Sequence, residues 1–176
     1  MGRLFLGTSG YSYQHWKKVF YPAGLAQSRW LEFYCEHFAT VELNVTFYRL
    51  PKQAVFAGWF QRTPADFVFA AKGSRFITHI KKLKDCREPL LAYKENAAGL
   101  KEKLAIILWQ LPPNLQFNKE RLQEFSQLLA DEYPEKVTPL SSGTRAGSTT
   151  RAMTSSLPTP LPCASPSPRA IPGPRR

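Results

Sequence analysis

The stretch V-E-L-N-V-T-F-Y-R-L-P at residues 41–51 constrains the fold of this chain more than any other segment. Side chains alternate between the two faces of a β-strand, so the pattern predicts a strand with one apolar and one polar face. The apolar face carries Val41, Leu43, Val45 and Phe47, and the polar face carries Glu42, Asn44, Thr46 and Tyr48.

Two interpretations of the polar face remain open from the strand alone. In an antiparallel sheet the polar side would simply face water. However, helical patterns precede and follow the strand, which is typical of β-α-β units whose parallel sheets are covered by helices. In a β/α barrel, inward side chains near the carboxyl ends of the strands line the mouth of the active site. The polar face is therefore a candidate functional site.

Strand and helix patterns alternate along the first 137 residues. Short apolar runs predict strands at residues 4–6, 41–48, 67–72 and 104–111. Helical spacing of apolar residues predicts helices at residues 28–38, 52–62 and 88–103, and a last helix capped by Asn118. We expect an α/β protein with TIM-barrel-like repeats, truncated to about four strand-helix units.

An aromatic-rich segment follows the first predicted strand. Residues 11–22 contain Tyr11, Tyr13, Trp16, Phe20 and Tyr21. Such a segment either covers the barrel mouth and stacks on a ligand, or forms an aromatic minicore that holds the loop in place. The sequence alone leaves both alternatives open.

The composition changes abruptly near residue 138. All 13 Asp and Glu residues lie at or before Glu135, and the chain beyond residue 138 consists mainly of Ser, Thr, Pro, Ala, Gly and Arg. Such a segment cannot bury enough apolar surface to fold. We therefore expect a folded domain at 1–137 and a disordered, low-complexity basic tail at 138–176. The tail is either genuine or the product of a reading frame lost near residue 137.

The cysteine spacing and the length of the apolar runs bear on whether the chain is disulfide-bonded, zinc-binding or membrane-spanning. The three cysteines are widely spaced and form no C-x-x-C pair, so neither a disulfide framework nor a zinc site is indicated. The sequence has no signal segment and no apolar run near the roughly 18 to 20 residues of a membrane span. We expect a cytoplasmic protein without a membrane partner, and the sequence leaves metals and cofactors unknown.

Four separated motifs resemble one known family. They are G-T-S-G-Y-S-Y-Q-H-W with F-Y-P at 7–22, V-E-L-N-V-T-F-Y-R-L-P at 41–51, F-V-F-A-A-K with R-F-I-T-H at 67–79, and Q-L-P-P at 110–113. In this order they resemble the amino-terminal half of the YecE-like proteins, a domain of unknown function that carries the number 72. The resemblance implies a barrel on the eight-fold β/α plan, with these motifs at the carboxyl ends of the strands. It implies no reaction, substrate or cofactor.

The resemblance also implies that part of the barrel is missing. The family continues into a strand with a Glu-Phe-Arg type motif and further strand-helix units, which this chain lacks. Val45 is also bulkier than the small residue expected between Asn44 and Thr46. Four parallel strands cannot close a barrel, so the first and fourth strands would keep unpaired edges. We therefore expect self-association through the open sheet edges and an inactive truncated product.

Three residues are candidates for catalysis. Glu42 is the one carboxylate that the pattern places inside the sheet, which suits a general base, a proton shuttle or a metal ligand. A structural bond to Lys72 explains Glu42 equally well. Lys72 ends the third predicted strand, where it either binds an anion or is solvated. His79 follows in a basic segment, where an imidazole suits phosphate contact or acid catalysis, or is an ordinary surface residue.

A larger group of residues is expected to bind substrate. The G-T-S-G loop at 7–10 has the composition of a phosphate cradle, and equally of any tight turn. Gln110 either binds a ligand or satisfies the backbone at the end of the fourth strand. The full set is Thr8, Ser9, Tyr11, Trp16, Asn44, Thr46, Tyr48, Arg49, Arg75 and Gln110.

Two functional hypotheses of different class remain. The first is an enzyme that acts on a phosphorylated or nucleic-acid substrate at the barrel mouth, with Glu42 assisted by His79 or Lys72. The alternative is a nucleic-acid-binding module without catalysis, which holds single strands by charge and stacking. Its basic residues are Arg49, Lys52, Lys72, Arg75, Lys81, Lys82 and Lys84.

Overall fold

A computed structural model describes residues 4–134 and 138–142 of the chain. The strands are β1 (Gly7–Ser9), β2 (Thr40–Leu43), β3 (Val68–Lys72), β4 (Leu104–Leu111) and β5 (Leu140–Ser142). The α-helices are α1 (Trp30–Cys35), α2 (Val45–Tyr48), α3 (Gln53–Gln61), α4 (Arg87–Ala97) and α5 (Lys119–Glu132). Shorter segments are the 3-10 turns η1 (Gln14–Trp16), η2 (Gln27–Arg29) and η4 (Ala98–Lys103) and the π-helical turn η3 (Phe76–Ile80).

The five strands form one parallel sheet in the order β1-β2-β3-β4-β5. The register places Ser9 beside Glu42, and Glu42 beside Ala70. One strand further along the sheet, Lys72 lies beside Leu108. Parallel neighbours that are joined through helical segments are β-α-β units, so the expected α/β class and parallel sheet are confirmed.

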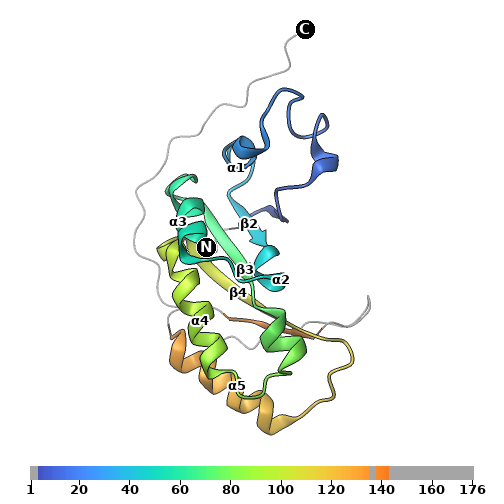
Figure 1. Cartoon of the computed structure of the whole chain (residues 1–176), viewed down its shortest axis with the longest axis vertical. Helices are drawn as coiled ribbons and strands as arrows, with labels where there is room; N and C mark the ends of the chain where they lie inside the picture. The colour runs from blue at the N-terminus through green and yellow to red at the C-terminus, as the bar shows by residue number, and fades with distance from the viewer. Residues whose placement is uncertain (1–3, 135–137, 143–176) are drawn as a thin grey trace.

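The helices cover one face of the sheet. In Figure 1, α3 and α4 lie along one side of the strands and α5 follows beyond them. Strand side chains on this face, such as Val41, Phe69 and Trp109, are almost fully buried and belong to the hydrophobic core. Side chains on the other face, including Glu42 and Lys72, are only half-buried. The core therefore lies between sheet and helices, while the opposite face keeps contact with solvent.

The most apolar strand and the last helix lie where the sequence predicts them. β4 spans Leu104–Leu111, the predicted continuous apolar run, and Pro112 follows it. At the start of α5, the Asn118 side chain accepts a hydrogen bond of 2.8 Å from the Arg121 backbone N–H, as expected of an N-cap. Both predictions are confirmed.

The predicted strand at 41–48 is wrong beyond Leu43. The chain turns into the short helix α2 there, so side chains no longer alternate between two faces. Thr46 is fully buried, whereas Tyr48 is 70% exposed. The Thr46 hydroxyl lies 2.7 Å from the Leu43 carbonyl oxygen and 2.6 Å from that of Lys72. The helical turn thus satisfies carbonyls at the ends of β2 and β3, which an extended chain would not reach.

Two other predicted boundaries differ from the structure. The first strand is Gly7–Ser9 and not residues 4–6, because its partner β2 begins at Thr40 and Thr40 pairs with Gly7. Leu4 and Leu6 lie before the strand and are exposed. The predicted helix at 88–103 is α-helical only to Ala97 and continues as the 3-10 turn η4.

The ordered sheet extends past residue 137, where the folded domain was expected to end. Leu140–Ser142 forms β5 in parallel register with the end of β4, and the Trp109 N–H donates to the Pro139 oxygen at 3.0 Å. Pairing at a sheet edge uses backbone groups and requires no apolar side chain, so composition could not reveal it. The predicted disordered tail otherwise concerns residues 143–176, which lie outside the described residues.

Candidate functional site

The candidate site lies at the carboxyl ends of β1, β2 and β3. Because parallel strands all end at the same edge of a sheet, Ser9, Glu42 and Lys72 are brought together from positions up to 63 residues apart. Their side chains share the sheet face that carries no helices. Two of the three predicted catalytic residues, Glu42 and Lys72, therefore meet in space.

The Glu42 carboxylate is held through one of its two oxygens. The Ser9 hydroxyl donates to Glu42 Oε1 at 2.9 Å, and the Lys72 ammonium lies 3.9 Å from the same oxygen. The side chains of Lys72 and Glu42 are 20% and 25% exposed. This ion pair is the structural bond considered from the sequence, and it fixes one side of the carboxylate.

Asn44 extends this network from the first residue after β2. Its Nδ2 donates to the Ser9 backbone oxygen at 3.1 Å and to the Ser9 hydroxyl oxygen at 2.7 Å. A backbone oxygen can only accept, so the amide nitrogen must face Ser9 and the orientation of Asn44 is fixed. Within residues 4–134 and 138–142, Glu42 Oε2 and Asn44 Oδ1 have no hydrogen-bond partner. Two acceptors are thus available to a ligand.

Two of the predicted binding residues instead support the backbone. The Thr8 hydroxyl donates to the Gly10 oxygen at 2.7 Å, and the Thr8 N–H donates to the Tyr34 hydroxyl at 2.9 Å. Thr46 is fully buried under the ends of β2 and β3. The buried Tyr93 hydroxyl also donates to the Lys72 oxygen, at 3.0 Å. Thr8 and Thr46 therefore position the strand ends from which Ser9 and Lys72 project.

His79 borders the same site through an aromatic bridge. The Lys72 ammonium lies 5.5 Å from the centre of the Phe47 ring, and the Phe47 and His79 rings are 5.0 Å apart, edge to face. The Thr78 hydroxyl oxygen lies 2.9 Å from His79 Nδ1. Burial lowers the pKa of His79, and the nearby charges of Arg75 and Lys72 lower it further. Both effects favour the neutral imidazole.

A cleft of about 320 Å³ opens beside Glu42 and Asn44. Its wall includes the aromatic residues Tyr11, Tyr13 and Trp59. The loop that supplies Tyr11 and Tyr13 turns at Gly10, which has a φ of 94°. A Cβ added to Gly10 would lie 2.6 Å from the Tyr13 hydroxyl oxygen. The position thus requires glycine, and this turn places the loop aromatics next to the strand ends.

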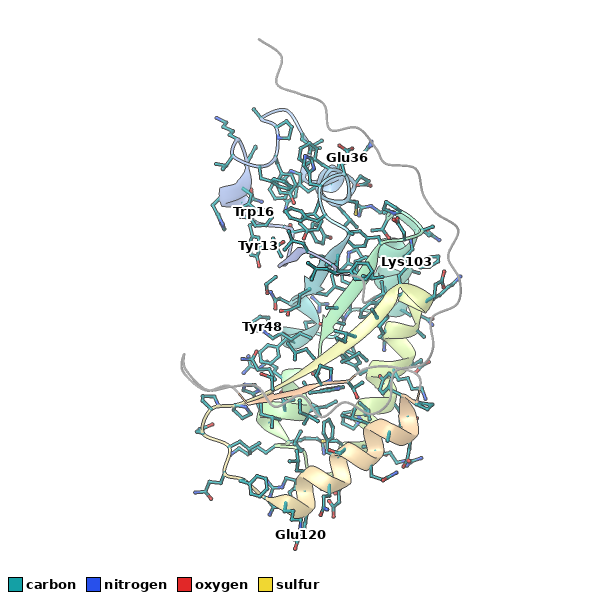
Figure 2. All side chains as sticks on the ribbon, turned by 180° about the vertical axis from the view of Figure 1, so that it is seen from behind. Tyr13, Trp16, Glu36, Tyr48, Lys103 and Glu120 are labelled. Carbon is teal, nitrogen blue, oxygen red and sulfur yellow. The ribbon has the colours of Figure 1, made fainter. Side chains whose placement is uncertain are left out.

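The rest of the aromatic segment forms a minicore. The rings of Tyr21 and Trp30 stack with centres 4.4 Å apart, and Trp16 and Phe20 pack edge to face at 5.5 Å. Trp16 therefore packs within the protein and does not line the cleft, whereas Tyr11 does. In Figure 2, Tyr13, Trp16 and Tyr48 lie on one side of the molecule, and Glu36 and Lys103 on the other.

Other predicted binding residues lie apart from the cleft. Tyr48 at the end of α2 and Arg49 directly after it are exposed, and Arg75 is exposed in the loop after β3. Gln110 lies on β4 in register with Ser141 of β5. These four residues are spread along the carboxyl edge of the sheet, and only Arg75 acts electrostatically on His79.

Sequence reasoning missed two residues that shape the site. Tyr13 belongs to the aromatic segment, but only the turn after β1 indicates that it returns to the strand end. Its hydroxyl donates to the Ser9 oxygen. Trp59 lies in α3, where helical spacing predicts a core residue and gives no sign of a cleft.

The described part of the chain contains no ready-made metal centre and no membrane span. Within residues 4–134 and 138–142, no three His, Cys, Asp or Glu side chains gather closely enough to hold a metal ion. Over the same residues, every helix is too short or too polar to cross a membrane.

Comparison with known proteins identifies similar chains. The model of the family described as protein of unknown function DUF72 matches residues 5–141. The UPF0759 protein YunF of Bacillus subtilis (strain 168) is 28% identical over 125 residues, which are 68% of this chain and 43% of that protein.

Solved structures share the fold. A DUF72 family protein from Thermotoga maritima MSB8 is 32% identical, with a TM-score of 0.66 over 78% of this chain and 55% of that chain. A DUF72 family protein from Enterococcus faecalis V583 is 22% identical, with a TM-score of 0.56 over 65% of this chain and 48% of that chain. The chain thus spans about half the length of the relatives that it matches.

Proposed function

The chain belongs to the DUF72 family of proteins of unknown function, and from that premise we propose that it acts as an enzyme on a phosphorylated substrate. Glu42 is the general base, and Lys72, Arg75 and His79 hold the phosphate. The observation that carries this proposal is the Glu42 carboxylate, which is fixed by Ser9 and Lys72 and borders a cleft of about 320 Å³.

Glu42 has the arrangement that a general base requires. Such a group needs a fixed orientation and an oxygen that can take a proton from the substrate. Ser9 and Lys72 both engage Oε1, which leaves Oε2 for the substrate. A positioned general base contributes about 100-fold to 10,000-fold to a rate.

The cations near His79 support a phosphorylated substrate. Arginine and lysine bind phosphate oxygens through charge-assisted hydrogen bonds. After burial, the charges of Arg75 and Lys72 lower the pKa of His79, so both positive charges act on the imidazole. A phosphate bound there would raise the pKa of His79, because a nearby negative charge favours the protonated ring.

A matched pair of glutamate variants tests this function. Phosphorus-31 NMR of the whole chain, incubated with sugar phosphates, nucleotides and short oligonucleotides, detects any change at the phosphate. Glu42→Gln should slow turnover at least about 100-fold and leave the thermal melt unchanged. Glu36→Gln, which alters an exposed carboxylate on the other side of the molecule, should keep the activity (Figure 2).

Two results would contradict the proposal. Turnover that survives Glu42→Gln would remove Glu42 from the mechanism. A failure to convert any substrate in the screen would count against an enzyme and favour a binding protein.

We propose further that the sheet is an arc of a β/α barrel. Support comes from five parallel strands in chain order, helices on one face, polar residues at the carboxyl ends, and relatives about twice as long. β1 and β5 are the edge strands among the described residues, and strand edges favour pairing with another chain. Sedimentation of the whole chain should therefore show concentration-dependent association. A monodisperse monomer at all concentrations would contradict that association.

One observation favours nucleic-acid binding as a second candidate function. The segment after β3 combines the exposed cations Arg75, Lys82 and Lys84 with two exposed apolar side chains, Phe76 at 45% and Ile80 at 60%. Cations track a phosphate backbone, and exposed aromatic rings stack on bases. The affinity for a single-stranded oligonucleotide should then fall steeply with salt, whereas a flat salt dependence would exclude this mode.

A further inference from the structure

The cleft beside Glu42 combines an aromatic wall with two hydrogen-bond acceptors. Tyr11, Tyr13 and Trp59 contribute to the wall, and the acceptors are Glu42 Oε2 and Asn44 Oδ1. We propose that this cleft binds a sugar ring, with two neighbouring hydroxyl groups donating to the two acceptors. The inference rests on the proposed function and names its substrate class, a phosphorylated sugar that carries a vicinal diol.

The hydrogen-bond network determines that the ligand must donate. Asn44 Nδ2 is occupied by both Ser9 oxygens, and Glu42 Oε1 is occupied by the Ser9 hydroxyl. A carboxylate has no proton to give, and an amide oxygen can only accept. The ligand groups that meet Glu42 and Asn44 must therefore be O–H or N–H donors.

The two acceptors are close enough for adjacent groups on one ring. Both residues are anchored to the same atom, the Ser9 hydroxyl oxygen, at 2.9 Å from Glu42 Oε1 and 2.7 Å from Asn44 Nδ2. Each free oxygen belongs to the same small planar group as the anchored atom. The shared anchor thus keeps both acceptors at one end of the cleft, where two neighbouring hydroxyl groups of a single sugar ring can donate to them.

The surroundings distinguish a sugar from other donors. An anionic group at the acceptors would be repelled by the Glu42 carboxylate, and a cationic amine would meet the Lys72 ammonium 3.9 Å from that carboxylate. A neutral polyol avoids both conflicts. The aromatic side chains of the cleft pack against the C–H face of a ring, and the volume of about 320 Å³ accommodates a single sugar.

The placement also connects binding with the proposed chemistry. The hydroxyl group on Glu42 Oε2 is the one that lies against the general base. Its O–H bond would break, the proton would move to Oε2, and the electron pair would stay on the sugar oxygen. The phosphate on the same sugar would reach toward Lys72 and Arg75.

A pair of ligands that differ by one hydroxyl group tests this inference on the unmodified chain. Isothermal titration compares ribose 5-phosphate, 2-deoxyribose 5-phosphate and inorganic phosphate. Losing a hydrogen bond to a charged acceptor costs about 1.5 to 3 kcal/mol, so ribose 5-phosphate should bind at least about 10-fold more tightly than its deoxy analogue. In Asn44→Ala the preference should fall, and in Asn96→Ala, on α4, it should not change.

The remaining outcomes separate the inference from the function on which it rests. If both sugar phosphates bind with equal affinity, or no more tightly than inorganic phosphate, the sugar cleft is wrong and the phosphate site stands. If inorganic phosphate and both sugar phosphates fail to bind at millimolar concentration, both proposals are wrong.

Discussion

Lys103 is a buried cation that closes the carboxyl end of α3, and its removal gives a measurable loss of stability. The residue is 5% exposed, and its Nζ donates to the Phe60 oxygen at 2.7 Å, the Thr63 oxygen at 2.8 Å and the Thr63 hydroxyl at 3.0 Å. The last carbonyls of a helix have no partner within the helix, so they need donors of this kind.

Lys103→Met removes the three donors and keeps the length and most of the volume of the side chain. Without Lys103, the Phe60 oxygen keeps a contact with the Thr63 hydroxyl at 3.3 Å, but the Thr63 oxygen loses the ammonium. An acceptor left unpaired in the interior costs about 1 to 3 kcal/mol, and hydrogen bonds to a charged group contribute about 1.5 to 3 kcal/mol. Relief from burying the ammonium offsets part of this loss. We expect a net destabilisation of about 2 to 3 kcal/mol.

Urea unfolding at pH 7, followed by circular dichroism, measures this difference in the free energy of unfolding. Lys101→Met in the same turn η4 is the control, because Lys101 is exposed and loses only a cation–π contact with the Phe60 ring at 4.9 Å, so stability should fall by less than about 1 kcal/mol. If Lys103→Met unfolds at the same urea concentration as the unmodified chain, the three hydrogen bonds contribute nothing net, and the reasoning is refuted.

The same variant has a second signature in its pH dependence. Burial lowers the pKa of Lys103 below its ordinary value of 10.5. Between the folded and unfolded pKa values the unfolded chain binds more protons, so Lys103 makes stability rise with pH in that alkaline range. The stability difference between the unmodified chain and Lys103→Met should therefore widen as the pH approaches 10.5.

Three further predictions concern packing and titration. Gly58→Ala should stabilise the chain by about 0.5 to 1 kcal/mol, since an added Cβ at this position in α3 meets nothing within 4 Å. Gly99→Ala should destabilise the chain, since its Cβ would lie 2.5 Å from the α3 backbone, and thermal melts compare the two variants. Burial raises the pKa of Cys35 to about 12 and that of Cys86 to about 11, so at pH 8 both should alkylate at least about 100-fold more slowly than a free thiol in peptide mass spectra. The pKa of His79 is lowered from 6.5 in the folded chain, so its contribution to stability is fully present above pH 6.5 and is lost as the pH falls through the pKa of the folded state. Thermal melts recorded at a series of acidic pH values measure this loss.

Elements whose signal is local could be predicted from the sequence. β4 is a continuous apolar run ended by prolines, and α5 begins at a side chain that caps its own backbone, so both needed only neighbouring residues. β5 depends on an edge that β4 offers from about 30 residues away. The short strand β5 carries no apolar pattern of its own, so the sequence could not reveal it.

The site was predictable only in part for the same reason. Glu42 stood out because it is the one carboxylate that the strand pattern places inside the sheet, and the parallel arrangement brought Lys72 beside it. Asn44 was selected by strand alternation, but the strand ends one residue earlier and its bond to Ser9 places it at the site. Tyr13 reaches the site because the chain turns at Gly10, and the sequence did not reveal that this turn brings Tyr13 back to the end of β1.

The most direct test of the proposed site is the pKa of His79 in the whole chain, measured by side-chain NMR with and without inorganic phosphate. Sodium chloride at matched ionic strength controls for screening of the neighbouring cations. The proposed site predicts a pKa below 6.5 in chloride and a higher pKa when phosphate binds beside Lys72 and Arg75. A pKa that is the same in both salts, while phosphate binds elsewhere on the chain, would contradict it.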